Sequence, residues 1–349
     1  MKLRYILLFC ALFILATSTV MPVDLYQLEK NRFVTKEESL ELPLDPGSRV
    51  IISSAVHLSG ELKVTTEKAE GILFEYKKIL KVGSESEAAD YAALIDVDIM
   101  RTSDGVKLLL QAPNPAPWAG TDDAGMIEAE LHLPGDCDVE VYADYFDVTM
   151  VGPFRSVENR SALGRQEIQN VTERLAVSGS GRDIRLKDIR GNISVGSNNA
   201  DIRIENMISE TKPAHISNEN GDIIMEAVRG AFTIDGSYGK IRIDGAELKG
   251  GISRITGSQC PIRLTIRDMT ESALTIADDY EDVELYVNKA VSAVFSLQVE
   301  SGGEVHVTRI PVRPITVASN YLEFVTGKGG PAIDIDVGGG GNIRIKGIR

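Results

Sequence analysis

A ten-residue pattern of apolar and polar positions recurs about every 20 residues in the second half of the chain. Each copy has an apolar start, a turn rich in Gly, Ser and Asn, often an acidic residue, and an apolar–polar–apolar ending. A fixed period of this length is typical of proteins that stack one structural unit on the next. The clear copies start at Val177, Val195, Ile216, Ile234, Ile255 and Ile276, and looser ones at Leu297, Val317 and Val337.

The ending of each copy predicts a strand with two inward-facing apolar residues, because residues i and i+2 of a strand share a face. Stacking equivalent strands in parallel buries these positions against one another, which no single copy could achieve. We therefore predict an all-β fold, a single-chain parallel β-solenoid with rungs of about 20 residues; the alternative architecture is an antiparallel sandwich. The two apolar columns are Ile184, Ile202, Ile223, Ile241, Ile262, Val283 and Leu186, Ile204, Met225, Ile243, Leu264, Leu285.

The first half of the chain is less regular. Ser84 and Glu87 have the spacing of a capping box, which predicts one short helix over 84–95. Alternating apolar residues predict strands, and a Pro-rich loop over 113–125 carries the single tryptophan, Trp118. The expected strands are 50–58, 61–66, 71–82, 95–100 and 106–112. The expected domains are an N-terminal leader (19–44), an N-terminal β region with the helix and the Pro/Trp loop (45–135) and the repeat domain (136–349).

The first 18 residues have the pattern of a secretory signal peptide. Lys2 and Arg4 precede an apolar run from Tyr5 to Ala16, and small polar residues follow. The run is shorter than the roughly 20 residues that a membrane-spanning helix needs. We therefore expect an exported protein, periplasmic, at the cell surface or secreted, with no membrane span in the mature chain.

Charge and cysteine content narrow the function classes. A net charge of −14 argues against nucleic acid, because phosphate binding needs a basic surface. Cys137 and Cys260 fall on rungs too distant for a disulfide, so we expect two free thiols. The four histidines stand singly, and no catalytic, cofactor or metal motif is present in the sequence. We therefore expect no enzyme activity and no cofactor.

The outward position between the two apolar columns carries the candidate binding face. One interpretation is a linear site for an anionic polymer such as a cell-surface polysaccharide, since guanidinium groups suit carboxylates. The other is a solvated face on which the basic and acidic residues neutralise each other. The candidate residues are Arg185, Arg203, Arg242 and Arg263 in one ladder and Asp183, Asp201 and Asp222 in a parallel one.

Two further features allow more than one interpretation. Trp118 either stacks on a sugar or partner, which adds it to the candidate face, or caps an open end of the solenoid. The acidic cluster Asp278, Asp279, Glu281 and Asp282 suits a hard cation such as calcium, but Asp is also favoured at solenoid corners. The Gly-rich C-terminus is expected to blunt one end of the stack.

The repeats also resemble a known family. The resemblance rests on the segment EAELHLPGDCDVEVYADYFDVTMVG and on the repeats NISVGSNNADIRI and GDIIM, which are similar to the bacterial DUF4097 group of adhesin-like proteins with toast-rack-like β-solenoid repeats. It implies an exported or envelope-associated β-repeat protein and brings no catalytic residues. We therefore expect a non-catalytic structural, adhesive or binding module of the cell envelope, with a surface polysaccharide or envelope protein as partner. The irregular segment 158–171 and the degraded copies after 297 depart from the pattern. The alternatives are a carbohydrate-active β-helix enzyme and an envelope-stress regulatory protein.

Overall fold

The computed structural model describes residues 24–67, 71–300 and 302–349, so the predicted signal peptide lies outside the described residues. Strands dominate this part of the chain, and α1 (Glu85–Leu94) is its one helix. The all-β class is therefore confirmed. Ser84 caps α1 by accepting a hydrogen bond from the Glu87 N–H at 3.3 Å, as the capping box predicts.

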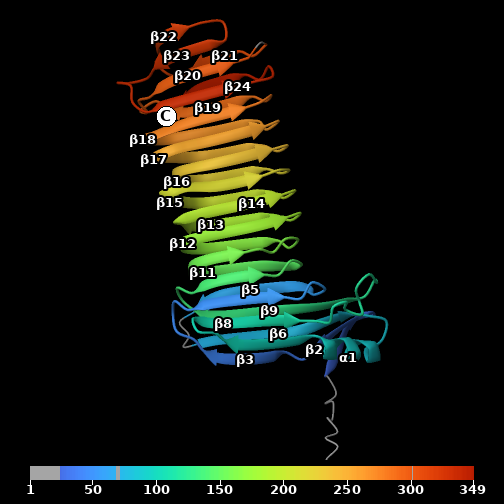
Figure 1. The fold of residues 1–349 in the computed structure, drawn as a ribbon. Coiled ribbons are helices and arrows are strands. Elements are labelled where there is room, and N and C mark those ends of the chain that lie inside the picture. The colour runs from blue at the N-terminus through green and yellow to red at the C-terminus, as the bar shows by residue number, and fades with distance from the viewer. Residues whose placement is uncertain (1–23, 68–70, 301) are drawn as a thin grey trace, which may run out of the picture.

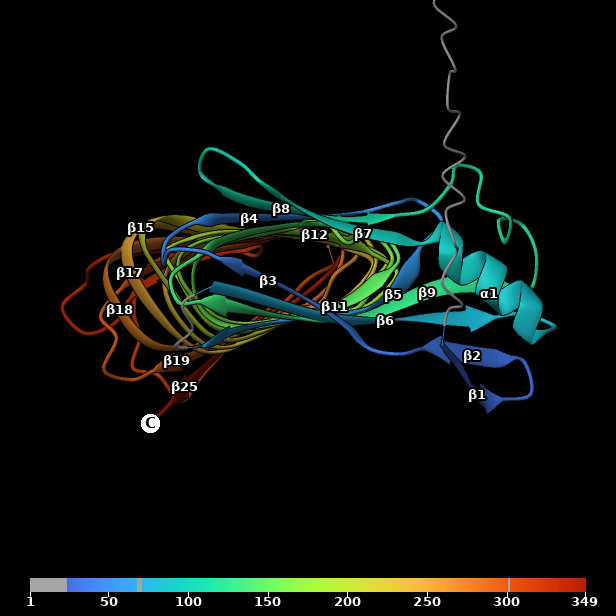
Figure 2. The same cartoon turned by 90° about the horizontal axis from the view of Figure 1, so that it is seen from below.

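The strands form a long stack (Figure 1). Seen along the stack, the chain winds around a flattened oval (Figure 2). Two rows of strands, row A and row B, face each other across an apolar core. Most neighbours within a row are parallel, so equivalent residues of successive repeats lie side by side. Ile184 pairs with Ile202, and Ile202 with Ile223, and all three are buried. The predicted apolar columns are thus in register.

Row A forms one side of the oval. Its outward residues are small and polar over much of its length, and its inward residues belong to the core. In spatial order it consists of β7 (Asp96–Arg101), β8 (Gly105–Gln111), β4 (Arg49–Ser54), β10 (Asp138–Tyr142), the second halves of β11 (Phe146–Asn159) and β12 (Gln166–Ser180), β14 (Asn192–Asn198), the second halves of β15 (Ile202–Asn218), β16 (Ile223–Ser237), β17 (Ile241–Ser258) and β18 (Ile262–Asp278), then β24 (Ala332–Val337), β20 (Val294–Val299), β23 (Tyr321–Val325) and β22 (Arg313–Val317).

Row B forms the opposite side and carries the predicted Arg ladder. It begins with β3 (Glu38–Pro43) and β2 (Arg32–Thr35), which both pair with β6 (Gly71–Lys81); β1 (Leu25–Glu29) pairs with β2. It continues through β9 (Ala124–Pro134), β5 (Ser59–Glu67), the first halves of β11 and β12, β13 (Ile184–Arg190), the first halves of β15, β16, β17 and β18, then β19 (Val283–Asn288), β25 (Ile343–Ile348) and β21 (Val305–Thr308).

Spatial order departs from chain order at both ends of the stack. The early rung β4–β5 lies between β8–β9 and β10–β11, and the last rung β24–β25 lies between β18–β19 and β20–β21. The copies expected at Leu297, Val317 and Val337 therefore do not follow one another, and Val317 lies on β22, antiparallel to β23. The Gly-rich C-terminus does not blunt an end, because β25 is paired on both edges.

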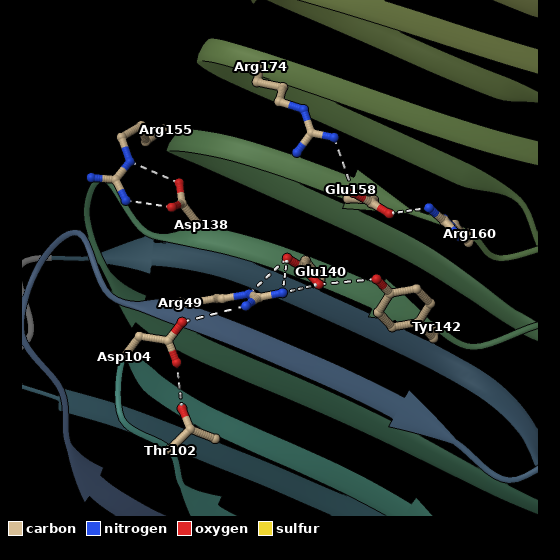
Figure 3. A network of polar contacts seen from close by, with 10 residues as sticks. All are labelled: Arg49, Thr102, Asp104, Asp138, Glu140, Tyr142, Arg155, Glu158, Arg160 and Arg174. Atoms are coloured by element: carbon tan, nitrogen blue, oxygen red, sulfur yellow. Dashed lines mark hydrogen bonds and ion pairs between the residues drawn. The ribbon is translucent and has the colours of Figure 1, made fainter.

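Charged side chains hold the early inserted rung in place (Figure 3). Arg49, at the start of β4, donates two hydrogen bonds to Glu140 on β10, at 2.9 and 3.1 Å. The same guanidinium lies 3.5 Å from Asp104, which directly precedes β8. On the next rung, Arg155 pairs with Asp138 at 2.5 Å. The inserted strand is thus tied to its neighbours on both sides.

The strand stack extends into the segments expected as the leader and the N-terminal β region. The leader, 19–44, contains β1, β2 and β3, which extend row B by pairing with β6. The stack also starts before residue 136, because β4, β5, β8 and β9 already pair in parallel within it. The sequence predicted β4, β5 and β8 as strands, but alternation within a single strand does not reveal which neighbours it pairs with.

The irregular segment 158–171 is part of the stack and contains a buried polar cluster. Asn159 donates to Gln166 at 2.9 Å, and Ser161 donates to Asn159 at 2.9 Å. Gln166 in turn donates to the Ser161 carbonyl at 2.8 Å. All three side chains are fully buried. Each buried group finds a partner, so the repeat tolerates polar residues here at little cost.

Candidate functional site on the outer face of row B

A groove of about 730 Å³ runs across the outer face of row B, over β11, β12, β13, β15, β16 and the start of β17. The predicted ladder provides three of its side chains. Its charged lining residues are Glu167, Arg185, Lys187, Arg203, Glu205, Glu226 and Arg242. The groove thus concentrates four basic and three acidic side chains on a chain with a net charge of −14.

The register of the strands sets the spacing of this ladder. Arg185 pairs with Arg203, Arg203 with Ile224, Ile224 with Arg242, and Arg242 with Arg263. Neighbouring strands are about 4.8 Å apart. Two pairs of adjacent arginines therefore flank one apolar residue, and the ladder spans five successive strands. We call these five residues the Arg ladder.

Each arginine at the lower end of the Arg ladder has an acidic partner. Arg185 donates to Glu167 at 3.2 Å and to Asp183 at 3.3 Å. Arg203 donates to Asp201 at 3.2 Å. Asp183 and Asp201 thus lie beside the arginines two residues further along the chain, as the parallel ladders predict.

The upper part of the Arg ladder pairs differently. Arg242 donates to Asp244 at 2.7 Å, on its other side along the strand. Asp222 instead pairs with Lys240 at 2.6 Å, one rung away in the acidic ladder. Arg263 lies over the ring of Tyr286, with its guanidinium carbon 4.7 Å from the ring centroid. Arg263 therefore belongs to the Arg ladder but not to the groove lining.

A second outward column lies beside the Arg ladder and was missed from sequence. Lys187 pairs in register with Glu205 and also forms an ion pair with it at 3.2 Å. Glu226 lies next to Glu205 on the following strand. The sequence does indicate this second column, because its residues stand two positions after those of the Arg ladder and therefore share their face of the sheet.

The ion pairs of the groove are exposed and easily exchanged. The Arg185, Arg203 and Arg242 side chains each keep close to half of their surface accessible. Exposed ion pairs of this kind contribute about 0–1 kcal/mol each to the stability of the folded protein. A ligand with carboxylates or sulfates of its own could take their place at little cost in free energy.

Trp118 does not belong to the binding face. It is 5 % exposed, and its indole N–H donates to the His57 carbonyl at 2.7 Å. Its ring lies 5.3 Å from that of Tyr91 on α1. A sugar cannot stack on a buried ring, so the ligand-stacking interpretation is wrong, and Trp118 packs α1 and its loop against the stack.

The acidic cluster at 278–282 is a structured corner. The Asp278 carboxylate is buried and accepts hydrogen bonds from the N–H groups of Tyr280 and Glu281 at 2.9 and 2.6 Å. Burial raises its pKa despite these bonds. Burial alone would also raise the pKa of Asp282, but Asn342 and the Arg344 guanidinium together lower it.

The carboxylates of Asp278 and Asp282 therefore lie in different environments. Within the described residues, no group of three or more His, Cys, Asp or Glu side chains is placed to hold a metal ion. Cys137 and Cys260 are free and buried, as expected, and burial raises the pKa of each thiol. In the part of the chain that the structure describes, no helix has the length and hydropathy to cross a membrane.

Comparison with known proteins gives distant likenesses only. No family model matches the chain, and no curated protein matches it. A solved structure described as a "putative cell adhesion protein" from Clostridium sporogenes is 11 % identical, with a TM-score of 0.21, over 90 % of this chain and 99 % of that one.

Two further solved structures show similar values. The "putative adhesin" from Parabacteroides merdae is 10 % identical, with a TM-score of 0.25, and that from Bacteroides fragilis is 9 % identical, with a TM-score of 0.24. Each alignment covers 90 % of this chain and 97 % of the other. The adhesin description belongs to those proteins, and the function of this chain has to be argued from its own groove.

Proposed function

We propose that this chain is an exported β-solenoid of the DUF4097 type that acts as a non-catalytic, adhesive binding module of the bacterial cell envelope. Its ligand is an acidic polysaccharide, and its binding site is the groove on row B. The observation that carries the proposal is the Arg ladder: regularly spaced guanidinium groups inside a hollow that crosses several strands.

The spacing of the Arg ladder suits a chain-like ligand. Arg185 and Arg203 provide one cationic pair within the groove. Arg242 in the groove and Arg263, which continues the Arg ladder past it, provide a second pair about three strands, or ~14 Å, further along. Ile224 lies between them and offers an apolar contact for a sugar ring. An extended polymer with repeated carboxylates can occupy both pairs at once, and a small anion can occupy only one.

The acidic partners of the groove tune the affinity. A bound polyanion competes with Glu167, Asp183 and Asp201 for the same guanidinium groups. The net gain for each charge is therefore modest, and binding depends on many weak contacts made together. Such binding is reversible and sensitive to salt.

The binding test compares two double variants with equal loss of charge. Arg203→Ala/Arg242→Ala removes two groove cations, and Arg174→Ala/Arg254→Ala removes two exposed cations from row A. We expect the wild type and the row A variant to be retained on polygalacturonate and heparin resins. The groove variant should elute at clearly lower salt. Equal retention of both variants would refute the groove as the binding site.

The carbohydrate-active enzyme is the second candidate, because Glu205 and Glu226 lie on adjacent strands within the groove. Paired carboxylates are the catalytic groups of most glycosidases. Incubation of the protein with the retained polysaccharide, followed by size analysis, separates the two functions. Release of shorter products that is lost in Glu226→Gln would overturn the non-catalytic proposal.

Export is tested separately. A C-terminally tagged full-length chain is expressed in a bacterial host, and its size and location are measured after cell fractionation. We expect a shortened chain outside the cytoplasm. Recovery of the unprocessed chain from the cytoplasm alone would contradict export and leave the binding test unaffected.

A further inference from the structure

The two ends of the stack carry complementary overhangs. At the upper end in Figure 1, row A continues through β23 and β22 beyond β20, whereas row B stops at β21, the partner of β20 in the same rung. At the lower end, row A stops at β7, whereas row B continues from β6 to β3. At the upper end, strands of row A therefore extend beyond row B, and at the lower end strands of row B extend beyond row A.

The upper overhang exposes an apolar inner face. β22 pairs only with β23 among the described strands, and all five of its residues are exposed. Val317 is 71 % exposed and Ile315 58 % exposed. Val317 stands in register with Leu322, a partly buried residue that packs on the core. An inward-facing apolar residue remains uncovered here because no row B strand lies opposite.

The lower overhang has the same character on the opposite row. On β3, Leu40 and Leu42 alternate with exposed residues and are only partly buried, although they pack on the core. On β7, the inward residues Val97 and Ile99 are also partly buried. Each end thus presents half of a two-layer core.

Charge also distinguishes the two ends. The upper edge carries Arg313 on β22, whereas the lower edge carries exposed Asp96 and Asp98 on β7. Arg101 closes β7, and β3 adds two more exposed acidic residues. The upper strand is therefore net positive, and the lower strands are net negative.

We propose that copies of this chain associate head to tail, with β22 of one copy pairing with β7 of the next. The occupant of the exposed edge is thus a second copy of the same chain. Val317 on β22 of the first copy then lies across the joint from Leu40 and Leu42 on β3 of the second. The β3 overhang thus covers the inner face of β22, which neither end covers alone.

The strand directions are compatible with this joint. β22 runs parallel to β20, since each is antiparallel to β23, whereas β7 runs antiparallel to β8. Copies related by translation along the stack therefore bring β22 and β7 together as an antiparallel pair, the commoner kind of pairing. The interface uses different surfaces on the two partners, so the assembly is open and grows into filaments.

The test blocks each end separately in the full chain. Val317→Lys places a charge in the upper overhang, and Leu40→Lys places one in the lower overhang. We expect the wild type to assemble with rising concentration in sedimentation velocity and to form filaments in electron micrographs. Each variant alone should stay monomeric. Their mixture should form dimers and stop there, because only one intact upper and one intact lower end remain.

Three controls complete the assembly test. Ile252→Lys, at an exposed site in the middle of the stack, should assemble like the wild type. Circular dichroism verifies the fold of each variant, and the charge pair Arg313→Glu and Asp98→Lys provides a milder version of the same mixing test. A monomeric wild type at all concentrations would overturn the proposal. Self-association of either blocked variant would overturn the head-to-tail arrangement.

Discussion

The register of the apolar columns leads to a quantitative prediction at Ile223. Its side chain is 1 % exposed and lies in one column between Ile202 and Ile241. Ile223→Ala removes three buried carbons, worth ~0.8 kcal/mol each in transfer free energy, or about 2.4 kcal/mol. The cavity left in a rigid stack adds to this, so we expect a loss of about 3–4 kcal/mol in the free energy of unfolding.

The adjacent residue provides a matched control. Ile224 is on the same strand, but it faces the groove and is partly exposed. Ile224→Ala should therefore cost less than about 1 kcal/mol. Urea unfolding followed by circular dichroism measures both variants. Equal losses, or a larger loss for Ile224→Ala, would refute the register, because a shift of one residue exchanges the inward and outward faces.

Three further predictions concern the corners and the core. Burial raises the pKa of Asp278 above its ordinary value of 3.8, so its ionisation destabilises the folded state as the pH rises through the folded pKa. Asp278→Asn keeps the side-chain carbonyl acceptor and should be more stable than the wild type at neutral pH in urea titrations, with a flatter pH dependence; lower stability there would contradict this. Gly230→Ala should lower the melting temperature clearly more than Gly181→Ala. Both glycines have positive φ, but only at Gly230 would an added Cβ lie 1.8 Å from a neighbouring backbone oxygen. Both buried cysteines should react with a thiol reagent only after unfolding, and rapid labelling of the native protein would show that the stack opens locally.

The interior of the stack was predictable because its pattern is strictly local. Each copy places two apolar residues around one outward residue, so Ile202 and Ile204 identify their strand, its faces and its register with Ile223 and Met225. The Arg ladder follows from the same register. Sequence alone could not order the rungs at the ends, because strands of similar pattern can pair with more than one neighbour. Ile335 on β24 pairs with Ile276 on one side and with Leu297 on the other, and nothing in its neighbouring residues shows that this strand lies between them.

The position of the Arg ladder was predictable, but its side-chain contacts were not. The choice of partner for each arginine depends on side-chain reach: Arg242 bonds to Asp244 on its own strand, whereas Asp222 pairs with Lys240. The hollow over the Arg ladder arises from side-chain lengths on neighbouring strands, which no alignment of copies describes. Trp118 illustrates the same limit, since a tryptophan in a Pro-rich loop is compatible with both exposure and burial.

The inserted C-terminal rung determines how the molecule resists mechanical force. A pull on the C-terminus acts first on β25, which is hydrogen-bonded along one edge to β19 and along the other to β21. A strand at the free edge of a stack can be peeled away one bond at a time. When the load acts along β25, two parallel ladders must instead slide at once, and a shear geometry of this kind resists force better than peeling. The rung that ends the chain is therefore positioned to bear load.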